Sequence, residues 1–373
     1  MTRRYDVFCK IVDNFGDIGV CWRLARQLQT EHEVDVRLFV DDLQVASRII
    51  PNLDATKILQ TIDRVEILRW DAGTKYPGYP DAVVEAFGCE LPAAYLADMP
   101  AETIWVNLEY LSAEPWVEGF HGQYSNFGVT RHKRYFFYPG FTEKTGGLLR
   151  EKSLLNRCSE SRIPLALQGI VSPNDTREML HISLFSYPHA PIGDLLLQLS
   201  QGSQNCVVYV SASVLFPAVQ AFFGLEKLDI GATYILGSLT VAVLPFLSQD
   251  DYDALLAFCD LNFVRGEDSW IRAIWAGKPF IWQPYRQEED AHLVKLDAFV
   301  DLFYADFPLK TMVWKAHKYW VAGQGDASIL GEYLRYLPEI QSDTARQSVK
   351  LASQTDLVSN LVIFIENLRG TRV

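Results

Sequence analysis

The chain has 373 residues, of which 49% are hydrophobic and 21% charged, a composition typical of a globular protein and not of a disordered one. At roughly 150 residues per domain, this length predicts two domains. The net charge of −12 predicts a soluble protein and argues against non-specific binding to nucleic acid or to an anionic membrane. No apolar stretch reaches the ~20 residues that a membrane span needs, so neither nucleic acid nor membrane is an expected partner.

The cysteine usage points to a reducing compartment. Six cysteines are scattered along the chain, mostly inside apolar runs, and none forms a Cys-x-x-Cys pair. This pattern predicts buried free thiols and neither a zinc site nor a redox motif. The first residues run directly into a strand pattern without a signal peptide, so a cytoplasmic location is expected.

Strand and helix patterns alternate in the first half of the chain. The first strand is expected at 5–12, followed by a glycine-containing turn and an amphipathic helix. Further strands are expected at 34–40, 65–70, 82–87, 103–108 and 135–138. Such alternation predicts a parallel sheet that is covered by helices on both faces.

A second alternation follows a stretch in which the periodicity fades, at 156–175. Strands are expected at 181–187, 206–210, 241–245, 261–264 and 280–283, helices at 250–259 and 270–275, and a terminal helix at 357–368. The expected fold is therefore α/β, with two Rossmann-like domains facing a central cleft and a domain boundary near residue 170. In such sheets ligands bind beyond the carboxyl ends of the strands.

An acidic turn lies after the first strand. Asp13 and Asp17 flank it, and Gly16 and Gly19 let the backbone bend before the helix. The dinucleotide fingerprint Gly-x-Gly-x-x-Gly is absent, and two carboxylates would repel a diphosphate. A cationic or proton-donating ligand fits better, although Asp17 could equally be an ordinary helix cap.

A second turn, at 265–269, follows a buried strand of the second half and opens a helix. Ser269, with Asp268 before it, is expected to cap that helix, whose amides and positive dipole end suit a diphosphate. Arg265 adds a guanidinium whose fork matches phosphate oxygens. An ordinary α/β unit would explain Ser269, but it would not explain why Arg265 and Glu267 both lie in this turn.

Both turns resemble parts of known glycosyltransferases. The order Ser269, Ala273, Gly277, Pro279 and Pro284 resembles the nucleotide-sugar half of GT-B enzymes. Segments 13–25 and 265–269 together resemble the elongation factor P arginine rhamnosyltransferase family, over essentially the whole chain. The resemblance implies a GT-B fold, dTDP-β-L-rhamnose as donor, an arginine of elongation factor P as acceptor, and inversion at the anomeric carbon. Domain 1–170, with helix 357–373, would bind the acceptor, and domain 171–356 the nucleotide sugar.

The same resemblance assigns site residues. The catalytic set matches Asp13, Asp17 and Glu267. The nucleotide-sugar contacts match Phe185, Tyr187, Phe246, Gln249, Arg265, Gly266, Asp268, Ser269 and Tyr285. The chain departs from the wider GT-B pattern at Arg272, where many relatives carry a glutamate that binds ribose hydroxyls. This departure weakens the case for a UDP-sugar and is compatible with a deoxyribose donor.

The chemistry of an arginine acceptor suits this set. A guanidinium stays cationic, so a carboxylate pair can hold it by two hydrogen bonds while one carboxylate takes a proton. We assign the base role to Asp17 and an orienting role to Asp13, while Glu267 contacts the sugar or the acceptor nitrogen. Arg265 and the helix start would stabilise the leaving diphosphate. No Asp-x-Asp metal motif is evident near the diphosphate turn, so neither a metal nor a cofactor is expected.

Three alternatives stand beside this interpretation. One is a GT-B transferase with another nucleotide sugar and a small-molecule acceptor. A second is a non-catalytic binding protein on a degenerate transferase fold, which the three carboxylates argue against. A nicotinamide dehydrogenase is disfavoured by the missing glycine fingerprint. Aromatics at strand ends, such as Phe185 and Phe246, are also more often core residues than ligand contacts.

Overall fold

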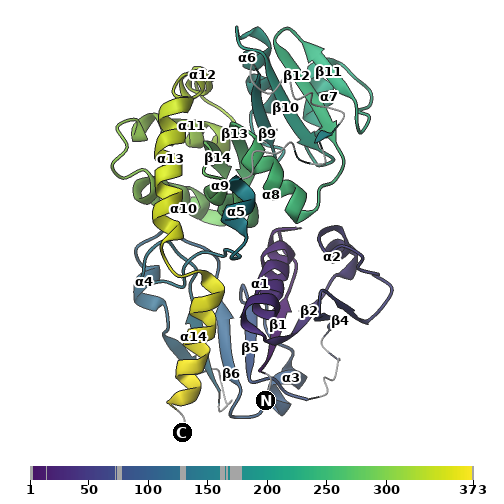
Figure 1. Cartoon of the computed structure of the whole chain (residues 1–373), viewed down its shortest axis with the longest axis vertical. Coiled ribbons are helices and arrows are strands. Elements are labelled where there is room, and N and C mark those ends of the chain that lie inside the picture. The colour runs from purple at the N-terminus through teal and green to yellow at the C-terminus, as the bar shows by residue number, and fades with distance from the viewer. Residues whose placement is uncertain are drawn as a thin grey trace. The chain divides into compact units, whose positions relative to one another are not determined.

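The computed structural model describes residues 3–13, 15–71, 73, 78–126, 132–159, 164, 167–168 and 179–371. The chain forms two compact units, one of Met1–Lys152 with Ala352–Val373 and one of Ser153–Leu351 (Figure 1). Each unit contains one sheet with helices around it, as the alternating strand and helix patterns predicted.

The sheet of the first unit has eight strands in the order β3-β4-β2-β1-β5-β6-β8-β7. The six interior strands form five parallel pairs, and the side chains of β1, β2, β5 and β6 are almost entirely buried. The strands are β1 (Arg4–Cys9), β2 (Asp35–Val40), β3 (Leu59–Ile62), β4 (Val65–Arg69), β5 (Ala82–Ala86), β6 (Ile104–Leu108), β7 (Tyr124–Asn126) and β8 (Lys133–Phe137).

Helices of the first unit come from both ends of the chain. They are α1 (Gly16–His32), α2 (Leu43–Ile49), α3 (Ala93–Asp98), α4 (Val117–Phe120) and α14 (Leu357–Gly370). The carboxylate of Asp356 caps α14 by accepting from the amides of Val358 and Ser359. It also accepts from Gln27 Nε2 at 3.0 Å, which ties α14 to α1.

The sheet of the second unit has six strands in the order β11-β12-β10-β9-β13-β14. Its strands are β9 (Leu180–Leu184), β10 (Cys206–Ser211), β11 (Thr233–Leu236), β12 (Leu239–Leu244), β13 (Leu261–Arg265) and β14 (Phe280–Gln283). Its helices are α5 (Leu154–Ser159), α6 (Ile192–Gln201), α7 (Phe216–Phe223), α8 (Gln249–Phe258), α9 (Asp268–Ala276), α10 (Ala291–Phe303), α11 (Lys310–Ala322), α12 (Ser328–Arg335) and α13 (Leu337–Ala352), with the 3-10 turn η3 (Glu288–Asp290).

The division between the units falls earlier than the boundary expected near residue 170. Helix α5 packs against α8 and α9, so the second unit already begins at Ser153. Most of 160–178, where the periodicity fades, lies outside the described residues.

The antiparallel strands β3, β7 and β11 were not predicted. Each lies at a sheet edge, has only three or four residues and is partly exposed, so it lacks a strong apolar pattern. All six cysteines are free, and five of them are buried. Among the described residues, no helix combines the length and apolar character that crossing a membrane requires.

Candidate active site

The acidic turn lies at the carboxyl end of β1, the edge where parallel sheets bind ligands. Asp17 sits in the first turn of α1 and is 3% exposed. Its Oδ2 accepts from the backbone amides of Val12 at 2.7 Å and Asp13 at 2.8 Å. One carboxylate oxygen therefore closes the turn, while Oδ1 lies 3.4 Å from the hydroxyl of Tyr110.

Asp17 is not a conventional helix cap. The N-cap position of α1 is occupied by Phe15, which makes no side-chain cap bond. The carboxylate of Asp17 binds amides that precede the helix and not those of its first turn. Asp17 is thus a buried carboxyl group fixed by the turn backbone through one oxygen, with its other oxygen next to the hydroxyl of Tyr110.

Burial is the main influence on the acidity of Asp17. It raises the pKa of this carboxyl, while the amides of Asp13 and Val12 and the hydroxyl of Tyr110 act to lower it. The carboxylate of Asp41, which follows β2, adds to the increase. A raised pKa makes the ionised carboxylate a stronger proton acceptor, which suits a general base.

Asp13 is half-buried on the same turn. Its carbonyl accepts from the amide of Gly16 at 2.8 Å, and its Oδ2 would lie 3.0 Å from a Cβ added at Gly16. A glycine at this position therefore lets the carboxylate of Asp13 fold over the helix start. Asn14, between the two aspartates, lies outside the described residues.

The predicted nucleotide-sugar residues gather at one edge of the second sheet. Strands β12, β9, β13 and β14 run parallel within this sheet, so their carboxyl ends point the same way. The residues that follow those ends include Phe246, Phe185, Tyr187, Tyr285 and the turn 265–269. Phe246 is 38% exposed and Tyr285 46%, so both can contact a ligand, in contrast to ordinary core aromatics.

Arg265 is held at the end of β13 by aromatic rings. Its guanidinium carbon lies 4.4 Å from the ring centroid of Phe185 and 4.7 Å from that of Tyr187. Its Nη1 donates to the carbonyl of Ser186 at 3.4 Å. Cation–π contact and this hydrogen bond orient the fork before any phosphate binds.

The turn after β13 departs from its predicted local structure at Ser269. Its hydroxyl accepts from the amide of Arg265 at 3.0 Å and donates to the carbonyl of the same residue, so it does not cap α9. The N-cap position is Glu267, which makes no side-chain cap bond. Gly266 has a φ of +61°, and its carbonyl accepts from Trp282 Nε1 at 2.7 Å. A left-handed backbone explains the glycine, and the serine closes the turn.

Two polar contacts fix the other residues of this turn. Lys295 Nζ of α10 donates to Glu267 Oε1 at 2.9 Å, and both side chains are largely buried. Gln249 Nε2, at the start of α8, donates to Asp268 Oδ2 at 3.4 Å. Lys295 was not predicted from the sequence, because no motif links a lysine inside α10 to a turn so far upstream.

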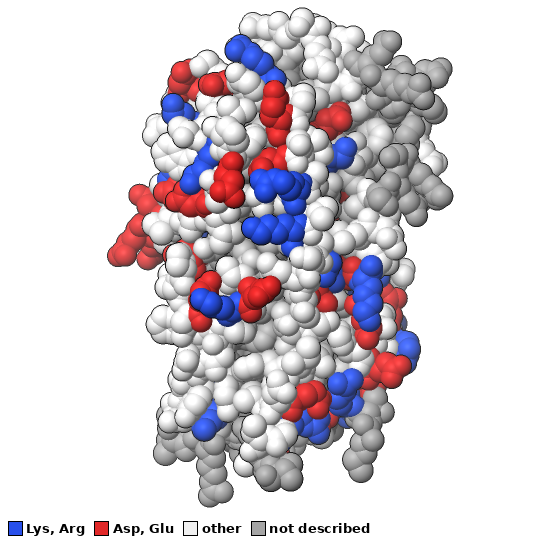
Figure 2. All heavy atoms as spheres, turned by 60° about the vertical axis from the view of Figure 1, so that its left-hand side comes forward, with Lys and Arg blue, Asp and Glu red and all other residues white. Residues whose placement is uncertain are grey.

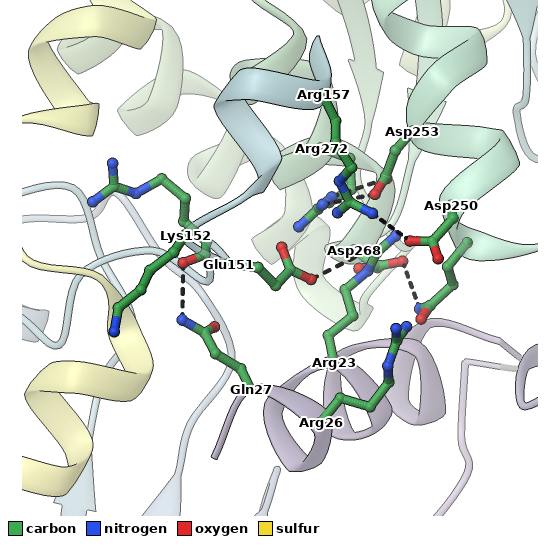
Figure 3. A network of polar contacts seen from close by, with 12 residues as sticks. Arg23, Arg26, Gln27, Glu151, Lys152, Arg157, Asp250, Asp253, Asp268 and Arg272 are labelled. Atoms are coloured by element: carbon green, nitrogen blue, oxygen red, sulfur yellow. Dashed lines mark hydrogen bonds and ion pairs between the residues drawn. The ribbon is translucent and has the colours of Figure 1, made fainter. Parts of the chain in front are cut away.

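Arg272 has a different partner from the ribose contact of other GT-B enzymes. Its Nε and Nη2 donate to the two carboxylate oxygens of Asp253 on α8, at 2.9 and 2.7 Å. Figure 3 shows this pair, and both residues are buried. The guanidinium of Arg272 thus links α9 to α8.

Charge is distributed without a dominant basic region on the face that Figure 2 draws, where acidic and basic side chains lie interspersed. This distribution agrees with a net charge of −12 and gives no sign of a nucleic-acid surface on that face. Within the described part of the chain, no group of three or more His, Cys, Asp or Glu side chains is arranged to hold a metal ion.

Comparison with known proteins decides the family. Residues 5–366 match the family model of the elongation factor P (EF-P) rhamnosyltransferase EarP. The chain belongs to this family. Protein-arginine rhamnosyltransferases of Pseudomonas putida and Pseudomonas aeruginosa are similar to it, with 42% and 41% identity. The first alignment covers 98% of this chain and all of the relative, and the second covers 96% and 98%.

A solved structure of the EarP family supports the same assignment. That structure was described as the structural basis for EarP-mediated arginine glycosylation of translation elongation factor EF-P. It aligns with this chain with a TM-score of 0.69 and 32% identity. The alignment covers 98% of this chain and 99% of that chain. The fold is therefore that of GT-B glycosyltransferases, as predicted, and the protein is a glycosyltransferase of the EarP family.

Proposed function

We propose that this protein transfers L-rhamnose from dTDP-β-L-rhamnose to one arginine side chain of EF-P in the cytoplasm, with inversion at the anomeric carbon. The observation that carries the proposal is the buried carboxylate of Asp17, fixed by the turn backbone through one oxygen, with its other oxygen next to the hydroxyl of Tyr110. An anion of this kind suits a guanidinium acceptor. The names of the relatives support both the sugar and the acceptor.

The reaction is a single displacement. A nitrogen of the acceptor guanidinium attacks the anomeric carbon, the carbon–oxygen bond to the diphosphate breaks, and dTDP leaves with the electron pair. The proton lost by the nitrogen passes to Oδ1 of Asp17, since Oδ2 already accepts two backbone amides. Asp13 orients the guanidinium from the same turn.

The second unit provides the donor site. Arg265, pre-oriented by Phe185 and Tyr187, offers two N–H groups to phosphate oxygens, and the amino end of α9 adds its positive dipole. Together they stabilise the charge that develops on the leaving diphosphate. Residue 272 is an arginine paired with Asp253 and not a glutamate that could bind ribose hydroxyls, which is compatible with a deoxyribose nucleotide.

Transfer is proposed to need no divalent metal, because Arg265 and the helix end already supply positive charge for the diphosphate. Activity should persist after dialysis against EDTA, at the rate of a sample supplied with magnesium. Loss of transfer in EDTA with recovery on adding magnesium would contradict this part of the proposal.

The direct test is intact-mass analysis of EF-P after incubation with the enzyme and dTDP-β-L-rhamnose. We expect one added deoxyhexose, located on one arginine by fragmentation. A variant of EF-P with lysine at that arginine is the matched control and should remain unmodified. An unchanged EF-P mass, or equal transfer from a UDP-sugar, would contradict the proposal and favour a GT-B enzyme with another donor or acceptor.

A further inference from the structure

The turn that follows β5 has an unusual backbone. Phe87, Gly88 and Glu90 have φ values of +57°, +62° and +60°. The left-handed region is unfavourable for phenylalanine and glutamate, whose Cβ atoms crowd the backbone there. Such conformations persist only where surrounding contacts enforce them, and they concentrate at functional sites.

Buried polar side chains enforce this turn. Glu85 Oε1 accepts from the amide of Glu90 at 2.9 Å, and Asn107 Oδ1 accepts from the amide of Gly88 at 3.1 Å. Glu85 is 1% exposed, and its Oε2 is held by Trp105 Nε1 and by an ion pair with Arg134, each at 2.9 Å. The turn is thus anchored to strands β5 and β6 and to their neighbour β8.

The result of this anchoring is an aromatic stack beside the acidic turn. The ring of Phe87 lies flat on the ring of Tyr110, with centroids 4.4 Å apart and planes 12° from parallel. Tyr110 follows β6, and its hydroxyl lies 3.4 Å from Oδ1 of Asp17. Strands β1, β5 and β6 are consecutive in the sheet (Figure 1). Because they run parallel, the segments that follow their carboxyl ends, which hold Asp17, Phe87 and Tyr110, lie at one edge of the sheet.

We propose that Phe87 is a positioning residue that fixes the ring of Tyr110, and that the Tyr110 hydroxyl orients Oδ1 of Asp17 for proton transfer. This inference rests on the proposed function, in which Asp17 is the base. Two backbone amides fix Oδ2 of Asp17. The contact with the hydroxyl of Tyr110 then determines the direction of Oδ1.

A contact of 3.4 Å is long for a hydroxyl–carboxylate hydrogen bond, and catalytic contacts often tighten only when substrate binds. The stack is therefore needed to keep the hydroxyl in place before the acceptor arrives. If Phe87 and Tyr110 had only a structural role, removing the ring or the hydroxyl would lower stability but leave the pH profile of transfer unchanged.

The proposal predicts an effect on proton transfer. Among the described residues, the titratable groups near Asp17 include Asp13 on the same turn, Asp41 after β2, Cys9 in β1 and Tyr110 after β6. The Tyr110 side chain offers a hydrogen bond that stabilises the ionised carboxylate and so lowers the pKa of Asp17. Removing the hydroxyl should therefore raise the pKa of Asp17 and move the acidic limb of the activity profile to higher pH.

The decisive variant is Tyr110→Phe, which keeps the stack and removes only the hydroxyl. We expect the acidic limb of kcat to move upward by roughly half to one pH unit, with the Kd for dTDP unchanged. Phe87→Ala should lower kcat by roughly 3- to 30-fold through a loosened Tyr110, and Phe87→Tyr should restore it. Tyr124→Phe, at the exposed edge strand β7, is the control for loss of a hydroxyl.

Phe87→Gly separates backbone strain from the ring. It should melt at a higher temperature than Phe87→Ala, because glycine tolerates the left-handed backbone, yet be equally slow. The inference is overturned if the pH profile of Tyr110→Phe matches that of the wild type, or if folded Phe87→Ala has the wild-type kcat. In either case the proposed function still stands, provided that the wild-type enzyme modifies EF-P. A wild-type enzyme that does not modify EF-P overturns both.

Discussion

Lys295 Nζ donates to Glu267 Oε1 at 2.9 Å, across the turn that opens helix α9, and the two side chains are only 13% and 17% exposed. The candidate catalytic glutamate is therefore neutralised by a lysine of the same unit. Such a pair fixes the direction of the Glu267 carboxylate and offsets part of the cost of burying its charge.

Lys295→Met should consequently lower both stability and turnover. We expect a loss of about 1–3 kcal/mol in the free energy of unfolding, because a largely buried carboxylate loses its charged partner. Lys310→Met is the matched control, since Lys310 pairs with Asp301 nearer the surface, at 35% and 68% exposure, and surface pairs contribute about 0–1 kcal/mol. Wild-type melting and turnover in Lys295→Met would show that the pair is dispensable.

Arg265→Ala tests the donor site. Removing the fork that Phe185 and Tyr187 orient should weaken dTDP binding by roughly 1.5–3 kcal/mol, a factor of about 10 to 150 in Kd. Arg265→Lys should recover only part of this, because an ammonium lacks the planar fork. Lys227→Ala, which removes a well-exposed cation of the same unit, should leave the Kd unchanged. Calorimetric titration measures the Kd of each variant for dTDP. Equal affinity of the wild type for UDP and dTDP would count against a deoxyribose preference.

Arg272 should matter for folding and not for the ligand. Its bidentate pair with Asp253 is buried, so Arg272→Ala should destabilise the protein by about 3–5 kcal/mol. The double variant Arg272→Met/Asp253→Leu removes both charges and should recover most of that stability while binding dTDP normally. If the folded double variant lost dTDP affinity, Arg272 would have to contact the donor.

The sequence predicted the regular parts of this structure well, for a physical reason. Buried parallel strands such as β10 and β12 have nearly continuous apolar patterns, and the candidate ligand-binding turns lie at the carboxyl ends of such parallel strands. Contacts between distant segments leave no such pattern. The reach of Lys295 to Glu267, and the left-handed backbone at Phe87, depend on tertiary packing that no local motif encodes. Ser269 was assigned a cap because serine is common there, but its hydroxyl is satisfied by the backbone of Arg265.

Asp17→Asn is the sharpest test of the assigned base. The variant keeps the shape of the side chain, and its amide oxygen can still accept from Val12 and Asp13. The Kd for dTDP should be unchanged, because Arg265 and the start of α9 belong to the other unit. Turnover should fall by roughly 10²- to 10⁴-fold, the usual effect of losing a general base. Asp13→Asn should also slow transfer, but by less, since it leaves the proton acceptor in place.

Stability should change in the opposite direction from activity. Burial raises the pKa of Asp17 in the folded protein above its unfolded value, so folding favours the protonated carboxyl. The ionised side chain therefore opposes folding, and the stability it contributes at low pH is lost as pH rises through the folded pKa. Asp17→Asn should melt at or above the wild-type temperature near neutral pH, and this difference should vanish below the unfolded pKa of about 3.9. Measuring melting temperature, dTDP affinity and turnover on one sample separates the two roles. A stable variant with wild-type turnover would remove Asp17 from the mechanism and make Glu267 the next candidate base.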